Sequence, residues 1–370
     1  MKKLKNLLFS SLFLLAFAIS FTACSSDDDN LIDDGTKVEL PSNRAFILNS
    51  GNMGNNNAGL AFYAPKKNAK FIPNIFKKQN NKGLGDTGQS IIKVNNYMYV
   101  IVSGSKVLYK LNSAGVEVAS CTFSEEDGSP RCMTYKNDYL YVTLYSNQIV
   151  KIKADNLSKK AYLKVGSHPE EIVTINNHLY VANSGYHADF SHNAIDTISQ
   201  IDIESFKITK QIEVKTNPNQ LLVEDGNLYV LSWGDFTTTN PYYFQKVNIK
   251  DGSYNVENIA VATKVAKYKN MFYLVNSVTD WNTYATTVSY ATYDSEKSEL
   301  TESTFLQNAP KELMSTSVYM FCVNPYNGDL YIGTSDYKTN GNIYRFDNKG
   351  VFNEKFDCGG INPMNMIFFE

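Results

Sequence analysis

The chain has 370 residues, a formal net charge of −2, and 25 Tyr and 21 Phe among its aromatic residues. This length is enough for one large domain or two of ordinary size. A charge so close to zero excludes a general attraction to nucleic acid or to an acidic surface, and the abundance of aromatic residues favours many short strands.

Residues 1–23 predict a secretory signal. Lysines open the chain, an apolar run extends from Leu7 to Phe21, and small residues precede Cys24. The run is shorter than the roughly 20 apolar residues of a membrane-spanning helix. The order Thr-Ala-Cys resembles a bacterial lipobox, in which the cysteine is lipidated and becomes the new N-terminus. We therefore expect attachment to a membrane only through a lipid on Cys24. The alternative is an ordinary signal peptide with an incidental cysteine.

Residues 24–43 predict a disordered, acidic tether, because the segment has too little apolar surface to order itself. Serine and three aspartates behind Cys24 resemble the surface-export signal of lipoproteins from the Bacteroidetes. That resemblance implies a position on the outer face of the outer membrane. A solvated spacer on a periplasmic lipoprotein is the alternative.

One phrase recurs through residues 44–370: an apolar strand, a turn of Asn, Asp or Gly, and then a strand containing "LYV" or a close variant. Copies lie at 95–104, 137–146, 176–185, 225–234, 269–278 and 327–336. The turn residues suit tight hairpins between alternating strands. Two further strands follow each phrase, which gives four strands in a period of about 40–50 residues and predicts a β-propeller.

The two ends of this region predict how the ring closes. The C-terminal "INPMNMIFFE" matches 167–176 but has no phrase after it, and "NRAFILNSG" at 43–51 matches 177–185 but has no strand before it. We expect the C-terminal strand to be the innermost strand of a split blade completed by residues 43–79. Six whole copies and this split copy predict an all-β, seven-bladed propeller. An open solenoid, the alternative, would need polar capping repeats.

The loops that enter the inner strands and the loops that follow "LYV" should open on one face. Aligning the entering loops gives a column at the mouth of the central channel, completed by a serine or threonine from 315–317. Its other members are Gln89, Arg131, Glu170, Asn219, Thr263 and Met364. We expect Gln89, Arg131, Glu170 and Asn219 to bind a ligand through their polar groups.

Four long segments follow "LYV" strands, at 183–194, 232–243, 276–287 and 334–342. Aromatic side chains on one rim suit contact with a large, partly apolar ligand, although some would serve only to cover blade ends. The ligand-binding residues predicted there are Asn183, Tyr186, His187, Phe190, Trp233, Phe236, Tyr242, Trp281, Tyr284 and Tyr337.

We expect neither a metal site nor a resident cofactor. His187, Asp189 and His192 are ligand types that zinc accepts, but their spacing fits no rigid motif. The cysteines other than Cys24 lack zinc spacing, and the sequence does not indicate how they would pair.

Catalysis is not expected either. A sialidase-like propeller clamps a carboxylate with several arginines, whereas this chain has three and only Arg131 is predicted at the face. Glu170 with Asp235 or Asp280 would be a carboxylate pair, yet no spacing distinguishes it. No nucleophile motif occurs.

The repeated "LYV", the "NSG" after it and the "HPEE" and "NPNQ" before inner strands resemble surface-layer or YncE-like propellers. With the lipobox and acidic tag, the whole chain resembles the BtuG family of surface lipoproteins. The resemblance implies capture of cobalamin or a related corrinoid, and its transfer to a TonB-dependent outer-membrane transporter, BtuB. Neutral amides and hydroxyls suit the carboxamides of a corrinoid. A glycan-binding propeller and a protein-interaction propeller are the alternatives.

Overall fold

The structure is a computed structural model that describes residues 35–65, 70–185, 196–235, 241–280 and 282–370. The chain divides into two units, Met1–Asp34 and Gly35–Glu370, and only the second is described. The predicted signal, Cys24 and residues 25–34 of the tether therefore lie outside the described residues.

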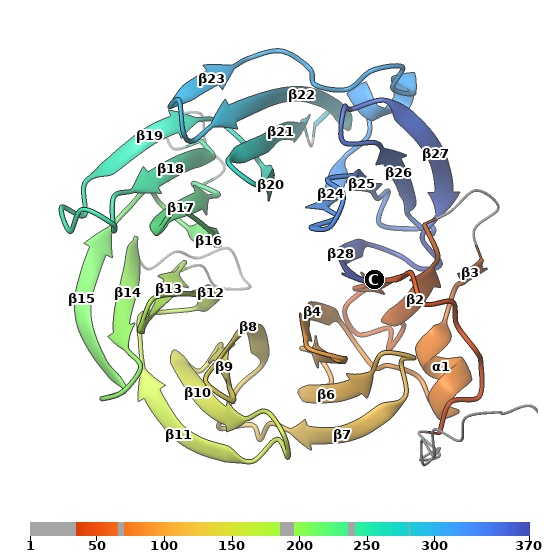
Figure 1. The fold of residues 1–370 in the computed structure, drawn as a ribbon, viewed down its shortest axis with the longest axis horizontal. Helices are drawn as coiled ribbons and strands as arrows, with labels where there is room; N and C mark the ends of the chain where they lie inside the picture. Colours follow the sequence, from red (N-terminus) through yellow and green to blue (C-terminus); the bar gives the residue numbers. More distant parts are fainter. Residues whose placement is uncertain (1–34, 66–69, 186–195, 236–240, 281) are drawn as a thin grey trace, which may run out of the picture. The chain divides into compact units, whose positions relative to one another are not determined.

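The described residues form seven four-stranded antiparallel sheets arranged as the blades of a propeller around a central axis (Figure 1). Six blades are continuous in sequence and run from an inner to an outer strand. Their strands are β4 (Gly88–Val94), β5 (Tyr97–Val102), β6 (Val107–Asn112), β7 (Glu117–Thr122); β8 (Pro130–Lys136), β9 (Tyr139–Leu144), β10 (Gln148–Lys153), β11 (Lys159–Lys164); β12 (Pro169–Ile175), β13 (His178–Asn183), β14 (Thr197–Asp202), β15 (Lys207–Glu213); β16 (Pro218–Glu224), β17 (Asn227–Ser232), β18 (Tyr243–Val247), β19 (Val256–Ala260); β20 (Lys264–Tyr268), β21 (Met271–Asp280), β22 (Ala285–Asp294), β23 (Glu299–Thr301); β24 (Val318–Val323), β25 (Leu330–Thr334), β26 (Asn342–Phe346), β27 (Phe352–Asp357).

The seventh blade is split, as the sequence predicts. Strand β28 (Pro363–Phe369) is its innermost strand and pairs with β1 (Arg44–Asn49), which is followed by β2 (Gly59–Tyr63) and β3 (Phe71–Ile72). Two short helices, α1 (Ile75–Asn80) and the 3₁₀ turn η1 (Lys311–Met314), lie among the described residues. Pairing of the C-terminal strand with the first strand closes the ring and satisfies edge groups that would otherwise be free.

Burial follows the position of a strand within its blade. The second strands β5, β9, β13 and β17, which carry the "LYV" phrase, are buried at every position after the first. Outer strands β7, β11 and β27 alternate between half-buried and exposed positions. A strand covered by neighbouring blades on both faces needs a continuous apolar run, and a strand with one wet face alternates.

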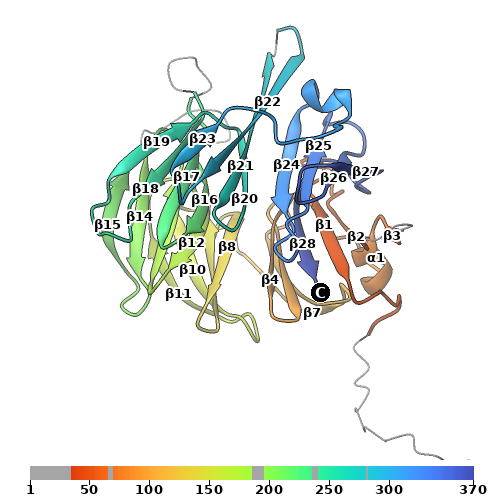
Figure 2. The same cartoon turned by 45° about the horizontal axis from the view of Figure 1, so that its top comes forward.

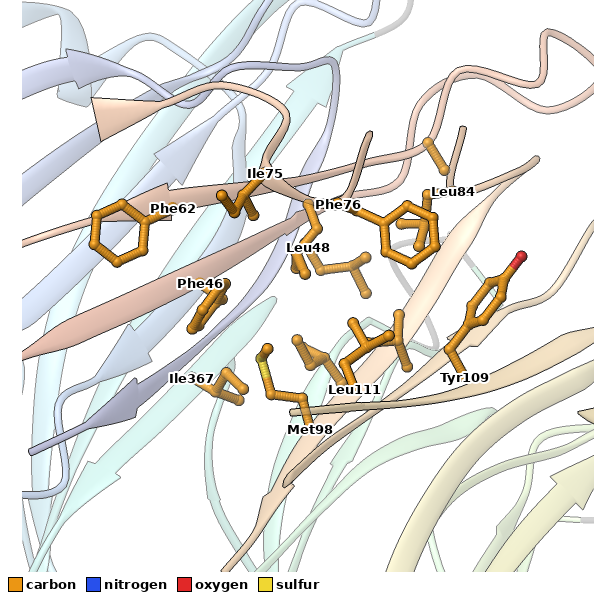
Figure 3. Packing of buried hydrophobic residues seen from close by; sticks show 14 of the residues in the cluster. Phe46, Leu48, Phe62, Ile75, Phe76, Leu84, Met98, Tyr109, Leu111 and Ile367 are labelled. Atoms are coloured by element: carbon orange, nitrogen blue, oxygen red, sulfur yellow. The ribbon is translucent and has the colours of Figure 1, made fainter. Parts of the chain in front are cut away.

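The cluster between the split blade and the following blade shows how closure is stabilised (Figure 3). Phe46 of β1 packs edge-on against Phe62 of β2 and Phe369 of β28, with ring centroids 5.8 and 5.9 Å apart. Phe76 of α1 and Met98 of β5 belong to the same buried cluster. The two ends of the propeller are therefore joined through a shared apolar core.

Residues 35–43 correct the predicted extent of the tether. The backbone N–H groups of Lys37 and Val38 donate to Oε1 of Gln79, at 2.9 and 3.1 Å. The side chains of Val38 and Leu40 pack against the cluster of the split blade. This part of the predicted tether is ordered because the buried Gln79 amide on α1 binds its backbone.

Segment 276–287 is a further correction, because it is an extended hairpin and not a long loop. Strands β21 and β22 stay paired from Met271 opposite Asp294 to Asp280 opposite Ala285. The Thr279 and Thr286 hydroxyls lie 2.8 Å apart across the pair. β-Branched residues favour this extended pairing, and Figure 2 shows the hairpin rising above its neighbours.

Candidate ligand-binding site at the channel mouth

A cavity of about 900 Å³ opens at the mouth of the central channel. A smaller cavity of about 160 Å³ adjoins it. Both cavities are lined by Gln89, Arg131, Trp233, Thr263, Lys264, Tyr319 and Met364. Because the two cavities share these residues, we treat them as two levels of one channel-mouth site.

Prolines at the start of inner strands explain how the column reaches the channel. Pro130, Pro169 and Pro218 begin β8, β12 and β16, and a register shift follows each of them. Proline suits a first strand position because it has no N–H to pair. The shift redirects the next side chain, which places Arg131, Glu170 and Asn219 in the cavity walls.

The column needs one correction, in the blade that begins with β24. A register shift between Val318 and Met320 gives Tyr319 the place that Arg131 and Asn219 occupy in their blades. The sequence predicts a serine or threonine from 315–317 at this place. Ser317 does line the larger cavity, but the inner strand projects the Tyr319 ring into both levels.

One wall of the site, on β4, β8 and β12, is a closed polar network. Arg131 donates from Nε to Oε2 of Glu170 at 2.8 Å and from Nη1 to Oε1 of Gln89. The hydroxyl of Tyr145 donates to Oε1 of Glu170 at 2.7 Å, and its ring lies 4.9 Å from the Arg131 guanidinium carbon. Glu170 and Gln89 are buried. The predicted polar residues of this wall are therefore hydrogen-bonded to one another.

Burial and neighbouring charge shift the pKa values of this wall. Burial, assisted by the Glu170 carboxylate, raises the pKa of Glu171 to about 7. Burial alone would lower the pKa of Arg131, but the Glu170 charge outweighs it and the pKa is raised. Burial also raises the pKa of the Cys132 thiol well above its usual value. Arg131 stays charged, and Glu171 titrates near neutrality.

The opposite wall is aromatic and carries an ammonium group; it is formed by the segment between β17 and β18 together with β20 and β24. Nζ of Lys264 lies 5.4 Å from the ring centre of Trp233 and 5.7 Å from that of Tyr319. The ring centroids of Trp233 and Tyr242 are 6.5 Å apart, and those of Tyr319 and Tyr337 are 5.8 Å apart. Burial lowers the pKa of Lys264 to about 8. Sequence analysis missed Lys264 and Tyr319, although Lys264 directly follows the column residue Thr263.

The structure brings together seven of the predicted site residues. Those lining one or both cavities are Gln89, Arg131, Glu170, Asn219, Trp233, Tyr242 and Tyr337. Residues of the column and residues of the rim loops therefore lie on the same face of the propeller. Predictions for Tyr186, His187, Phe190, Phe236 and Trp281 fall outside the described residues.

Asn183 and Tyr284 do not line the site. Asn183 is fully buried inside its blade and donates to the Ser199 hydroxyl at 2.9 Å. A Cβ on Gly166 would lie 2.4 Å from Asn183 Cγ, so the asparagine packs tightly against the loop that enters β12, the inner strand of its own blade. Tyr284 is 78% exposed in the turn of the β21–β22 hairpin. The "NSG" asparagine is thus structural, and extension of the hairpin carries Tyr284 away from the channel.

Among the described residues, no group of three or more His, Cys, Asp or Glu side chains is arranged to hold a metal ion. His187, Asp189 and His192 lie outside them. The cysteines Cys121, Cys132, Cys322 and Cys358 are unpaired. No helix in the described part of the chain is long and apolar enough to span a membrane.

Comparison with known proteins supports the fold class. No protein-family model matches the sequence, and no curated protein matches it. Hydrazine synthase of Kuenenia stuttgartiensis is similar in structure, with a TM-score of 0.57 and 14% identity over 70% of this chain and 76% of that chain. BamB from Moraxella catarrhalis has a TM-score of 0.50 and 11% identity over 88% and 85% of the two chains. The WD40 repeats of RRP9 have a TM-score of 0.52 and 9% identity over 73% of this chain and 80% of that chain.

At such low identity these likenesses concern the fold alone. They agree with the strand order in placing the chain among the β-propellers. The seven blades and the split blade are given by the strand order. The neighbours include an enzyme, hydrazine synthase, alongside WD40 repeats and BamB. The fold therefore leaves the activity to be argued from the channel-mouth site.

Proposed function

We propose that this propeller is a cell-surface lipoprotein that captures cobalamin or a related corrinoid at the channel-mouth site. The observation that carries the proposal is the division of that site into two walls. One wall presents hydrogen-bonded polar groups around Arg131, and the other presents the rings of Trp233, Tyr242 and Tyr319. A corrinoid has the same division, because its apolar macrocycle is edged by carboxamides.

The size of the site supports partial enclosure of such a ligand. A volume of about 900 Å³ lies near the upper end of the range for small-molecule pockets, roughly 300–1,000 Å³. The amides of Gln89, Asn219 and Asn276 donate and accept hydrogen bonds, as carboxamides require. Oδ1 of Asn276 is buried and accepts no hydrogen bond within the described residues. A corrinoid would place its edge in the cavity and leave the remainder exposed.

The arrangement of arginines favours binding over catalysis. Arg44 donates to the backbone oxygens of Pro41 and Ser113, and Arg345 pairs with Asp329 and Glu354. Neither of these arginines lines the channel-mouth site. Arg131 is left as the arginine of the site, and Glu170 already pairs with it. The clamp of several arginines needed for sialidase-like chemistry is thus not assembled from them.

The location and the transporter partner are proposed from the sequence. Cys24 would carry the lipid, the acidic residues behind it would direct export to the surface, and a TonB-dependent transporter would receive the ligand. A glycan is the second candidate ligand, because Tyr337 lines the cavity and is 44% exposed, as a ring that stacks on a sugar would be.

Titration calorimetry tests the ligand class. The protein starting at Gly35 should bind cobalamin with one-to-one stoichiometry and without changing it. If micromolar cobalamin gives no heat and a glycan binds measurably, the ligand is a glycan and the cobalamin proposal is wrong.

A further inference from the structure

The two basic side chains of the channel-mouth site are in different electrostatic situations. The guanidinium of Arg131 lies 2.8 Å from the Glu170 carboxylate, so its charge is offset within the wall. Nζ of Lys264 lies near the rings of Trp233 and Tyr319, and among the described residues no carboxylate pairs with it. An ammonium group in a partly buried wall without an anion is costly.

A second donor on the same wall also lacks a partner. Nε1 of Trp233 is buried and has no hydrogen-bond acceptor among the described residues. Buried polar groups are nearly always paired, so two unmatched donors beside each other need an explanation. Burial as the cause of the lowered pKa of Lys264 is consistent with this, because a nearby carboxylate would oppose the shift.

We propose that Lys264 binds an anionic group, a phosphate or a carboxylate, on a ligand whose apolar surface rests on Trp233 and Tyr319. Cation–π contacts hold the ammonium between the two rings and leave its N–H donors for an anion. The rings supply the apolar area that adjoins the anion. The charges of Arg131 and Glu170 already offset each other, so a ligand anion is directed to the Lys264 side of the cavity.

Under the proposed function, the anionic group that Lys264 recognises belongs to the corrinoid. Cobalamin carries one phosphodiester, in its nucleotide loop, whereas cobinamide lacks that loop and its phosphate. Lys264 would therefore bind the phosphodiester and make the site discriminate between complete and incomplete corrinoids. The identity of the corrinoid rests on the proposed function, but the anion site itself does not.

The first experiment measures Lys264 directly and needs no corrinoid. Protein labelled with ¹³C at the lysine ε-carbons is titrated with pH, and the Lys264 signal is identified by its absence in Lys264→Arg. Inorganic phosphate should raise the apparent pKa of Lys264 by about one unit relative to sodium chloride of equal ionic strength. Acetate in a parallel titration separates phosphate from carboxylate recognition. Lys207, exposed at the start of β15, should respond to neither anion.

The second experiment compares cobalamin with cobinamide by calorimetry. Lys264→Met should weaken cobalamin binding by at least about tenfold and leave cobinamide binding unchanged, because only cobalamin offers the charged partner. Lys207→Met is the matched control and should change neither. An equal loss for both corrinoids would overturn the anion assignment.

The two proposals fail in different ways. If the wild-type protein binds neither corrinoid, the proposed function fails, and the Lys264 titration still decides the anion site. If both corrinoids bind but the Lys264 pKa is unchanged by phosphate, acetate and cobalamin, the anion site is wrong and the proposed function stands.

Discussion

Nε of Arg131 lies 2.8 Å from Oε2 of Glu170, and this contact joins the inner strands of two neighbouring blades, β8 and β12. The pair sits in the wall of the channel-mouth site, where Tyr145 and Gln89 complete its hydrogen bonds. The charges of Arg131 and Glu170 are therefore already paired with each other. Their contribution to a ligand is a fixed, neutral polar surface.

A double-mutant cycle tests this pairing. Arg131→Met leaves the buried Glu170 carboxylate without its partner and should lower the free energy of unfolding by about 3 kcal/mol. Adding Glu170→Gln should recover a large part of that loss, since the uncompensated charge is removed. Urea unfolding of the four proteins measures the coupling. Strictly additive losses would mean that the contact contributes nothing.

Glu171 predicts a pH dependence of stability. Its pKa rises from 4.5 in the unfolded chain to about 7 in the folded protein. Between these values the folded state holds a proton that the unfolded state has released, so stability falls as pH rises through this window. Glu171→Gln removes that cost. It should raise the free energy of unfolding by about 2 kcal/mol at pH 8 and much less at pH 5.

Glu170→Gln is the matched control for this experiment. It removes the partner of Arg131 and should destabilise the protein at both pH values. Thermal or urea unfolding at pH 5 and pH 8 separates the two variants. Equal effects of Glu171→Gln at the two pH values would refute the assigned titration.

Closure of the ring predicts the effect of a C-terminal truncation. Deleting residues 361–370 removes β28, leaves the edge of β1 that faced β28 unpaired and exposes Phe46, whose ring packs against Phe369. We expect almost complete loss of soluble folded protein. A chain that begins at Gly35 keeps every contact described for the propeller and is the control. A truncated protein with the melting temperature of that control would contradict closure by β28.

Much of this architecture was predictable, for identifiable reasons. Hairpin turns and the "LYV" strands specify each blade, and the match of the C-terminus to 167–176 predicted the split blade. Prolines such as Pro130 and Pro218 fix where inner strands begin, so the column could be aligned. These are local signals, and each one repeats.

Two of the features that were missed depend on contacts between segments distant in the sequence, and a third depends on how far a hairpin extends. Pairing of Arg131 with Glu170 requires the distance between blades, which no single repeat encodes. Gln79 binds the backbone of residues 37 and 38, which lie about 40 positions before it in the sequence. The hairpin that carries Tyr284 resembled a loop because its turn is rich in Asp, Asn and Thr, although its flanks are β-branched.

Cys24 predicts the mode of membrane attachment. Cys24→Ala removes the thiol that would carry the lipid, so the full-length protein should leave the membrane fraction. Fractionation after a carbonate wash provides the measurement. A variant that stays with the membranes would show that lipidation of Cys24 is not the anchor.

Trp233 predicts which part of the rim binds the ligand. It lines both levels of the channel-mouth site, and buried aromatic anchors dominate the energy of most interfaces. Trp233→Ala should weaken corrinoid binding by about 2 kcal/mol. Tyr284→Ala, at the exposed hairpin turn, and Lys207→Ala, on the opposite face, should have little effect. Calorimetry that shows a larger loss for Lys207→Ala than for Trp233→Ala would mean that the binding face is inverted.

The crystal structure of the protein in complex with cobalamin is the most direct test of the central claim. The account predicts corrinoid density at the channel mouth, with the macrocycle against Trp233 and Tyr319 and carboxamides facing the Arg131 wall. Cobalamin bound on the opposite face or along the outer strands, with the channel-mouth cavity left unchanged, would contradict it.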